Sequence, residues 1–202
     1  IIGVVSAMTV PSLMQNYQKQ SYVTQLHKAY NLCSQAALQV LTDRNALSLK
    51  EAGITSLDEI DVFVKSYFKI VQDCGKTGTS CFAVGEYKKI DGTKVALFET
   101  ELFKYYVLAD GMSIAFYPAS YGLQIDVDIN GKKGPNIIGR DTFAFVIYNN
   151  GVVDDYVYAS SIPPFTSEQR EEAYTKMCIS AETPNWFGCL GKIINDGWQM
   201  TY

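Results

Sequence analysis

The sequence predicts an α+β protein in which a long N-terminal α-helix packs on an antiparallel β-sheet head. Three patterns indicate this fold: an apolar stripe with helical spacing near the N-terminus, alternating segments joined by Asp-Gly and Asn-Gly turns further on, and two closely spaced cysteine pairs. A chain of 202 residues can bury a sizeable core, and 48% hydrophobic with 19% charged residues is typical of a globular protein. No linker or repeat divides the globular part further.

The first thirteen residues carry no charge. This run is shorter than the ~20 apolar residues that a transmembrane helix needs. It also has neither an initiator Met nor a basic flank, so it does not resemble an intact signal peptide. We therefore expect it to be the later part of a longer apolar helix. Pro11 removes a backbone donor and predicts a kink or local melting there.

Beyond Ser12, apolar residues recur at alternating steps of three and four, as they do along one face of an α-helix. This apolar stripe consists of Val23, Leu26, Tyr30, Cys33, Ala37 and Val40. The helix is predicted to run to about Leu41, which makes it about 60 Å long. Its front half must then project or be buried by another molecule. The chain is accordingly divided into a protruding apolar half-helix, residues 1–22, and a globular head, residues 23–202.

The head is predicted to hold a second helix, a sheet of about four strands and a short helical C-terminal region. Ser56 and Glu59 have the spacing of a capping box, and the apolar face of the helix that follows is expected to reach Val71. Hairpin turns are expected at 109–111 and 149–151. The expected strands are 105–108, 112–116, 124–128, 142–147, 152–153 and a final 198–202, and the expected C-terminal helices are 167–176 and 190–194.

The five cysteines separate into two close pairs, Cys74 with Cys81 and Cys178 with Cys189, and Cys33. Other pairings are compatible with the sequence. Neither close pair has the spacing of a zinc or redox motif. We predict two disulfides, each contributing roughly 2–3 kcal/mol, in an extracytoplasmic compartment. Cys33 is interpreted as a small buried residue on the apolar stripe, with pairing between subunits as the alternative.

The segment from Ile1 to Leu13, followed by Asn16-Tyr17-Gln18-Lys19, resembles the conserved helix of type IV pilins and type II secretion pseudopilins from its middle onward. Residues 126–136 and 139–143 look like a block found in many pilin-like proteins. The pair Cys178–Cys189 is similar in position to a disulfide that staples the C-terminal region of many pilins. The resemblance implies a lollipop-shaped molecule. Family members begin with a methylated aromatic residue and a nearby glutamate, and neither is present in this sequence.

The resemblance implies a structural subunit of an extracellular type IV-type filament at the bacterial cell surface, held in the inner membrane before assembly. Its partners would be copies of itself and the pilus or secretion assembly machinery. The residues assigned to the filament-core helix are Ile1, Ile2, Gly3, Val4, Val5, Met8, Val10, Pro11 and Leu13. The alternatives are a type II secretion pseudopilin and a membrane-tethered binding module that does not polymerise. An enzyme is not expected, because His27 is the only histidine and no nucleophile motif accompanies it.

Asp126, Asp128 and Asn130, followed by Gly131, reproduce the first half of an EF-hand calcium loop. Ile137 stands where a closing carboxylate is required, although Asp141 is available from the next strand. A calcium site and a purely structural turn are therefore both left open, and no other cofactor is expected.

Nucleic acid is an unexpected partner for a chain with a net charge of -4. Lys132, Lys133 and Arg140 nevertheless form a modest basic cluster, so contact with DNA is not excluded. A solvated loop or a contact between subunits is the plainer interpretation of these charges.

Overall fold

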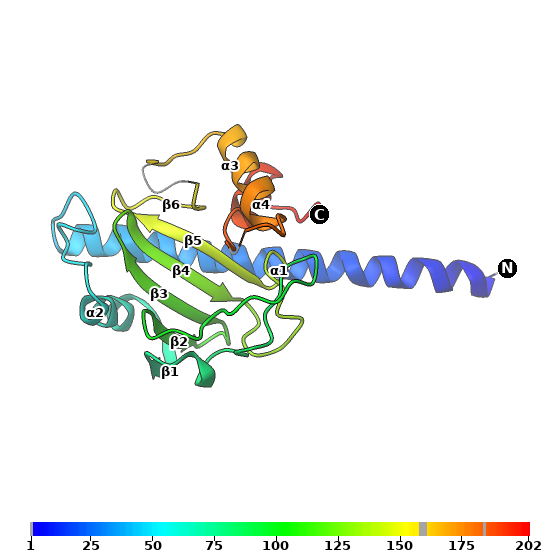
Figure 1. Cartoon of the computed structure of the whole chain (residues 1–202), viewed down its shortest axis with the longest axis horizontal. Helices are drawn as coiled ribbons and strands as arrows, with labels where there is room; N and C mark the ends of the chain where they lie inside the picture. Colours follow the sequence, from blue (N-terminus) through cyan, green and yellow to red (C-terminus); the bar gives the residue numbers. More distant parts are fainter. Residues whose placement is uncertain (1, 158–160, 184) are drawn as a thin grey trace.

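The computed structural model describes residues 2–157, 161–183 and 185–202, with side chains from Leu13 onward. It confirms the α+β class: one long helix crosses a six-stranded antiparallel sheet and extends well beyond it (Figure 1). The helices are α1 (Ile2–Asp43), α2 (Leu57–Tyr67), α3 (Ser167–Ala173) and α4 (Cys189–Asn195), with a 3-10 turn η1 (Gly78–Ser80) and a π-helical turn η2 (Tyr174–Cys178). The strands are β1 (Ile70–Gly75), β2 (Lys104–Leu108), β3 (Ser113–Ala119), β4 (Gly122–Asp128), β5 (Thr142–Tyr148) and β6 (Val153–Asp154). They are neighbours in chain order.

One face of the sheet packs against α1, as the apolar stripe predicts. Leu26, Cys33 and Val40 are fully buried in the main core, and Tyr30 is half-buried with its hydroxyl donating to the carbonyl of Val153 at 3.1 Å. β5 alternates in the expected way: Phe143, Phe145 and Ile147 belong to this core. The helix is therefore held by burial of one face along its second half.

The opposite face of the sheet is covered by the C-terminal region. Ala144, Val146 and Tyr148 of β5 pack there with Phe165 and Met177 in a second apolar cluster. Because both faces are covered, every residue of β4 and β5 is buried. This explains why polar side chains of β4, such as Asp126, lie in the interior.

The predicted element boundaries need four corrections. The sheet has six strands instead of about four, and the helix that starts after Ser56 ends at Tyr67. Val71 lies on the exposed edge strand β1 and not on that helix. The helix expected over 167–176 gives way to a π-helical turn after Ala173. Residues 198–202 are not a strand, because positive φ values at Gly197 and Trp198 turn the chain towards α1.

The buried carboxyl of Asp126 makes the stability of this fold depend on pH. Its Oδ1 accepts hydrogen bonds from Gln124 Nε2 at 3.0 Å and Trp186 Nε1 at 3.4 Å. Burial raises the pKa of Asp126 to about 7, and the two hydrogen bonds offset this only in part. The neutral acid is therefore the favoured form in the folded protein below about pH 7.

We expect the free energy of unfolding to fall as pH rises, in calcium-free buffer. An unfolded Asp has a pKa of about 3.9, so between that value and about 7 the folded state holds a proton that the unfolded state has lost. The contribution of Asp126 should change by about 2 kcal/mol between about pH 5 and about pH 7. The free energy of unfolding would be measured with urea at several pH values in this range. It should depend less steeply on pH in Asp126→Asn than in the wild type, and an equal dependence on pH would contradict the expectation.

Candidate functional site: the front of helix α1 and the groove beside it

The front segment of α1, residues 2–22, projects from the head over most of its length (Figure 1). Its last turn meets the head, where Tyr22 packs against the main core. It is helical from Ile2 onward without a break at Pro11, so melting near Pro11 is not a feature of the isolated chain. The first charged side chain of α1 is Lys19. Within the described residues, no helix is both long and apolar enough to cross a membrane.

The apolar side chains of the front segment are exposed from Leu13 to Tyr17, at the start of the part for which the structure describes side chains. Leu13, Met14 and Tyr17 are 66%, 60% and 74% exposed, and they surround a shallow hollow with Gln18. Val23, in contrast, is 7% exposed and begins the buried stripe. Burying an exposed side chain of this size contributes about 1.5–3 kcal/mol. The front segment thus presents an unpaired apolar surface to any partner that can cover it.

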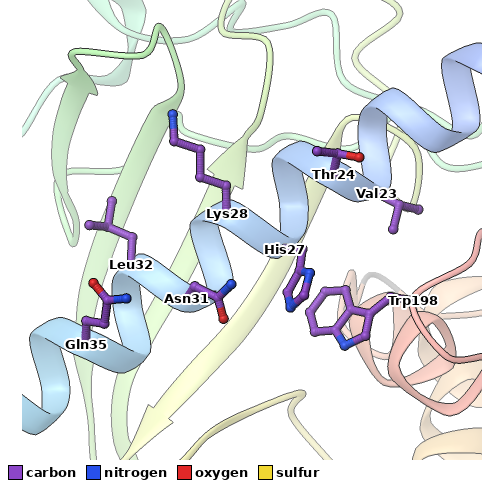
Figure 2. A pocket seen from close by; sticks show the side chains of 8 residues that line it. All are labelled: Val23, Thr24, His27, Lys28, Asn31, Leu32, Gln35 and Trp198. Atoms are coloured by element: carbon purple, nitrogen blue, oxygen red, sulfur yellow. The ribbon is translucent and has the colours of Figure 1, made fainter.

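A groove follows α1 where the front segment meets the head. One part, of about 540 Å³, is lined by eight residues of α1 and the C-terminal tail (Figure 2). A second part, of about 570 Å³, continues towards the front segment, and the two share Val23, Thr24 and Trp198. The lining residues of both parts are Asn16, Lys19, Gln20, Val23, Thr24, His27, Lys28, Asn31, Leu32, Gln35, Trp198, Gln199 and Met200. They include amides, apolar groups and three basic side chains but no carboxylate.

Trp198 forms the wall of the groove opposite α1. Its ring stacks on His27, with 3.9 Å between centroids and 23° between planes, and meets Tyr30 edge-on at 5.2 Å (Figure 2). Its backbone N–H donates to Ile193 O at 2.8 Å, which ties the tail to α4. His27 is therefore a packed side chain of the groove.

The C-terminal region that carries Trp198 is fastened to the sheet by one ion pair and by the hydrogen bonds of a buried carboxyl group. Arg170 of α3 makes a bidentate contact with Asp154 of β6, with Nε–Oδ1 at 3.0 Å and Nη2–Oδ2 at 2.6 Å. The next residue, Asp155, accepts the backbone N–H groups of Gly188 at 2.7 Å and Gly191 at 2.6 Å and so caps α4. These contacts place α3 and α4 against the edge of the sheet.

A buried lysine fixes the loop between η2 and α4. Lys89 is 2% exposed, and its Nζ donates to the carbonyls of Met177 at 3.3 Å, Ser180 at 2.7 Å and Thr183 at 2.7 Å. Burial lowers the pKa of this lysine, while three carbonyl acceptors satisfy its three donors. Three carbonyl groups at and around this loop therefore converge on the ammonium group of Lys89, which holds the loop in place.

The structure confirms both predicted disulfides. Cys74 pairs with Cys81, and Cys178 of η2 pairs with Cys189 of α4. Cys33 is free and fully buried on the apolar stripe, and burial raises the pKa of its thiol. Its side chain therefore cannot reach another subunit while the chain is folded.

The structure locates the predicted filament-core residues only in part. Ile1 lies outside the described residues. Seven others are placed in α1 by their backbone alone: Ile2, Gly3, Val4, Val5, Met8, Val10 and Pro11. Leu13 is placed with its side chain, which is exposed.

The three residues of the predicted calcium loop do not form one group. Asp126 and Asp128 lie within β4, and Asn130 lies in the turn that follows. Asp126 contacts Gln124 and Trp186, whereas Asn130 contacts Asp141. Over the described part of the chain, no three His, Cys, Asp or Glu side chains gather in a way that would hold a metal ion. Calcium binding stays a prediction.

The predicted basic cluster is placed less compactly than its sequence suggests. Lys132 donates to the carbonyl of Thr79 at 2.8 Å, while Arg140 lines a hollow with Tyr22 and Tyr202. These two side chains have different neighbours. Contact with DNA stays untested.

Comparisons of the chain with models of known protein families, with curated proteins and with solved structures found no match. The function is therefore inferred from the site itself.

Proposed function

We propose that the chain is a pilin, the structural subunit of an extracellular type IV-type filament, and that it assembles through the front segment of α1. The observation that carries the proposal is the uncovered apolar surface at Leu13, Met14 and Tyr17 on a helix that projects from the head. An apolar surface of this kind requires a partner. The projecting geometry leaves the head free while the front segment is covered.

The physical chemistry of the front segment supports a partner of the same kind. An apolar helix satisfies its own backbone groups in a membrane, so a subunit can be held in the inner membrane before assembly. Once it leaves the membrane, its surface must be covered again, and copies of the same helix can do so. A repeated contact that does not close into a ring produces a helical filament. The pilus or secretion assembly machinery would supply the transfer.

The head has the properties that exposure outside the cell demands. Two disulfides close short loops, and such bonds persist in oxidising compartments. The buried Lys89 and the Arg170–Asp154 contact hold the C-terminal region in place without any other molecule. The proposed location is therefore the filament at the cell surface, with the inner membrane as the site before assembly.

We expect Met14→Glu to abolish filaments. A charge on the face shared by Leu13 and Tyr17 would have to be desolvated in the assembled state, which costs several kcal/mol for each subunit. The matched control is Leu47→Glu, because Leu47 is 88% exposed but lies on the head beyond α1. Cells producing each full-length protein would be examined by electron microscopy for surface filaments, with subunit levels checked by immunoblot.

Filaments with Leu47→Glu and none with Met14→Glu, at equal subunit levels, would support the proposal. Filaments of normal length with Met14→Glu would exclude assembly through the front segment. Short fibres confined to the periplasm would favour a type II secretion pseudopilin. If cells keep all their fibres after the gene is deleted, a membrane-tethered binding module would be favoured.

A further inference from the structure

Buried oxygens without partners gather at one place in the head. Among the described residues, four buried side-chain polar atoms have no hydrogen-bond partner. Three of them, Asn130 Oδ1, Asn136 Oδ1 and Thr142 Oγ1, belong to the connection between β4 and β5 or to the first residue of β5. Buried polar atoms are normally satisfied, so three unpaired oxygens around one connection call for a further partner, which a cation or a water can supply.

Two buried carboxylates lie among these oxygens. Asp128 ends β4 and Asp141 precedes β5, and both have no exposed surface. Neither forms an ion pair with any Lys, Arg or His in the part of the chain that the structure describes. Their hydrogen-bond donors are neutral: Tyr87 Oη donates to Asp128 Oδ2 at 2.8 Å, and the Ile137 N–H donates to Asp141 Oδ1 at 2.7 Å. A buried charged carboxylate normally has a cationic partner or coordinates a metal.

Each residue that carries an unpartnered oxygen is a neighbour of Asp128 or Asp141. Thr142 lies directly opposite Asp128 on the neighbouring strand. The next residues along, Ile129 and Asp141, form the backbone hydrogen bond, so Asp128 and Thr142 are a non-hydrogen-bonded pair, in which the side chains lie closer together. Side chains of such a pair stand on the same face, about 5 Å apart at Cβ. The hydroxyl of Thr142, a residue only 2% exposed, therefore lies beside the Asp128 carboxylate.

The two asparagines approach from the side of Asp141. Asn136, 3% exposed, donates its backbone N–H to Asp141 Oδ2 at 2.9 Å. Asn130 Nδ2 donates to Asp141 Oδ2 at 3.3 Å and to Gly134 O at 3.4 Å. Rotating this amide by half a turn would put its unpartnered Oδ1 on the side of those two oxygens. A cation would favour that orientation, because all three groups would then present oxygen.

We propose that this cluster binds one calcium ion, with Asp128, Asp141, Asn130 and Thr142 as its side-chain ligands and Gly134 O as a backbone ligand. All the ligand atoms are oxygens, including two carboxylates and a carbonyl, which is the set that calcium takes in flexible geometries of six to eight ligands. Imidazole and thiolate, which favour zinc or copper, are absent from this ligand set. The site shares Asp128 and Asn130 with the loop predicted from the sequence, but Asp126 is not part of it. It is independent of whether the chain forms filaments.

Calcium titration of the purified protein tests the site. After treatment with a chelator, calcium or magnesium would be added at millimolar concentration, with binding followed by calorimetry and thermal unfolding. We expect one calcium per chain and a rise of about 5–10 °C in the unfolding midpoint at saturating calcium. Asp141→Asn should lose both effects. Asn130→Ala, at a partly exposed position, should lose most of the binding without endangering the fold.

Asp126→Asn is the matched control, because this buried carboxylate lies two positions before Asp128 in β4 but contacts Gln124 and Trp186. Calcium stabilisation kept in Asp126→Asn and lost in Asn130→Ala would support the proposed ligand set. Unchanged stabilisation in Asn130→Ala, or none in the wild type, would overturn it. Equal stabilisation by magnesium would overturn the assignment to calcium.

Discussion

Replacing Arg170 with methionine is expected to lower the free energy of unfolding by about 3–5 kcal/mol. Methionine keeps most of the stem of Arg170, which packs on Gly191 of α4, but removes both hydrogen bonds to Asp154. Asp154 is almost fully buried and would be left as an uncompensated charge at the edge of the sheet. Urea unfolding followed by circular dichroism would measure the loss.

The double variant Arg170→Met with Asp154→Asn separates the cost of the orphaned charge from the value of the pair itself. Asparagine retains the Oδ1 that accepts the N–H of Asp155 at 2.8 Å, while it removes the charge. More than half of the lost stability should therefore return. A double variant no more stable than Arg170→Met alone would show that packing of the arginine, and not the unpaired carboxylate, sets the cost.

The parts of the fold that were predictable from the sequence are those encoded by local periodicity. The stripe from Val23 to Val40 defines one face of α1, and the turns around Gly111 and Gly151 define two hairpins. The two disulfides join the cysteines that are close in sequence, as predicted. The absence of charge before Lys19 likewise follows from the sequence alone.

Features that depend on distant contacts were not predictable in this way. β1 has an irregular pattern with two register shifts against β2, so alternation does not reveal it. Trp198 forms a wall of the groove only because the C-terminal tail returns to His27, and neither residue signals the other. The same holds for Lys89, whose acceptors lie about ninety positions later in the chain.

The sequence contains a weak indication of the contact between Asp154 and Arg170. Two adjacent acidic residues directly after a buried strand are costly unless basic or N–H partners cover them. Thr166 and Gln169 also form a capping box that marks the start of α3 and places Arg170 in its first turns. Together these patterns would have suggested that α3 lies against the end of β6.

Removing the Cys178–Cys189 disulfide is expected to destabilise the head by about 2–5 kcal/mol, more than removing Cys74–Cys81. The bond joins residues 11 apart, against 7 for the other, so it restricts the unfolded chain more. Its two sulfurs are also fully buried against Gly139, whereas Cys74 is half-buried. Substituting both cysteines with alanine therefore removes a chain constraint and leaves a cavity.

The paired comparison is Cys178→Ala with Cys189→Ala against Cys74→Ala with Cys81→Ala, each measured by urea unfolding without reductant. The first should also loosen the attachment of α4, so hydrogen exchange should rise in α4 and in the tail around Trp198. The second should leave exchange in the tail unchanged, because its loop lies near β1. Equal losses of stability with no change around Trp198 would mean that Lys89 and Arg170, and not the disulfide, hold the C-terminal region in place.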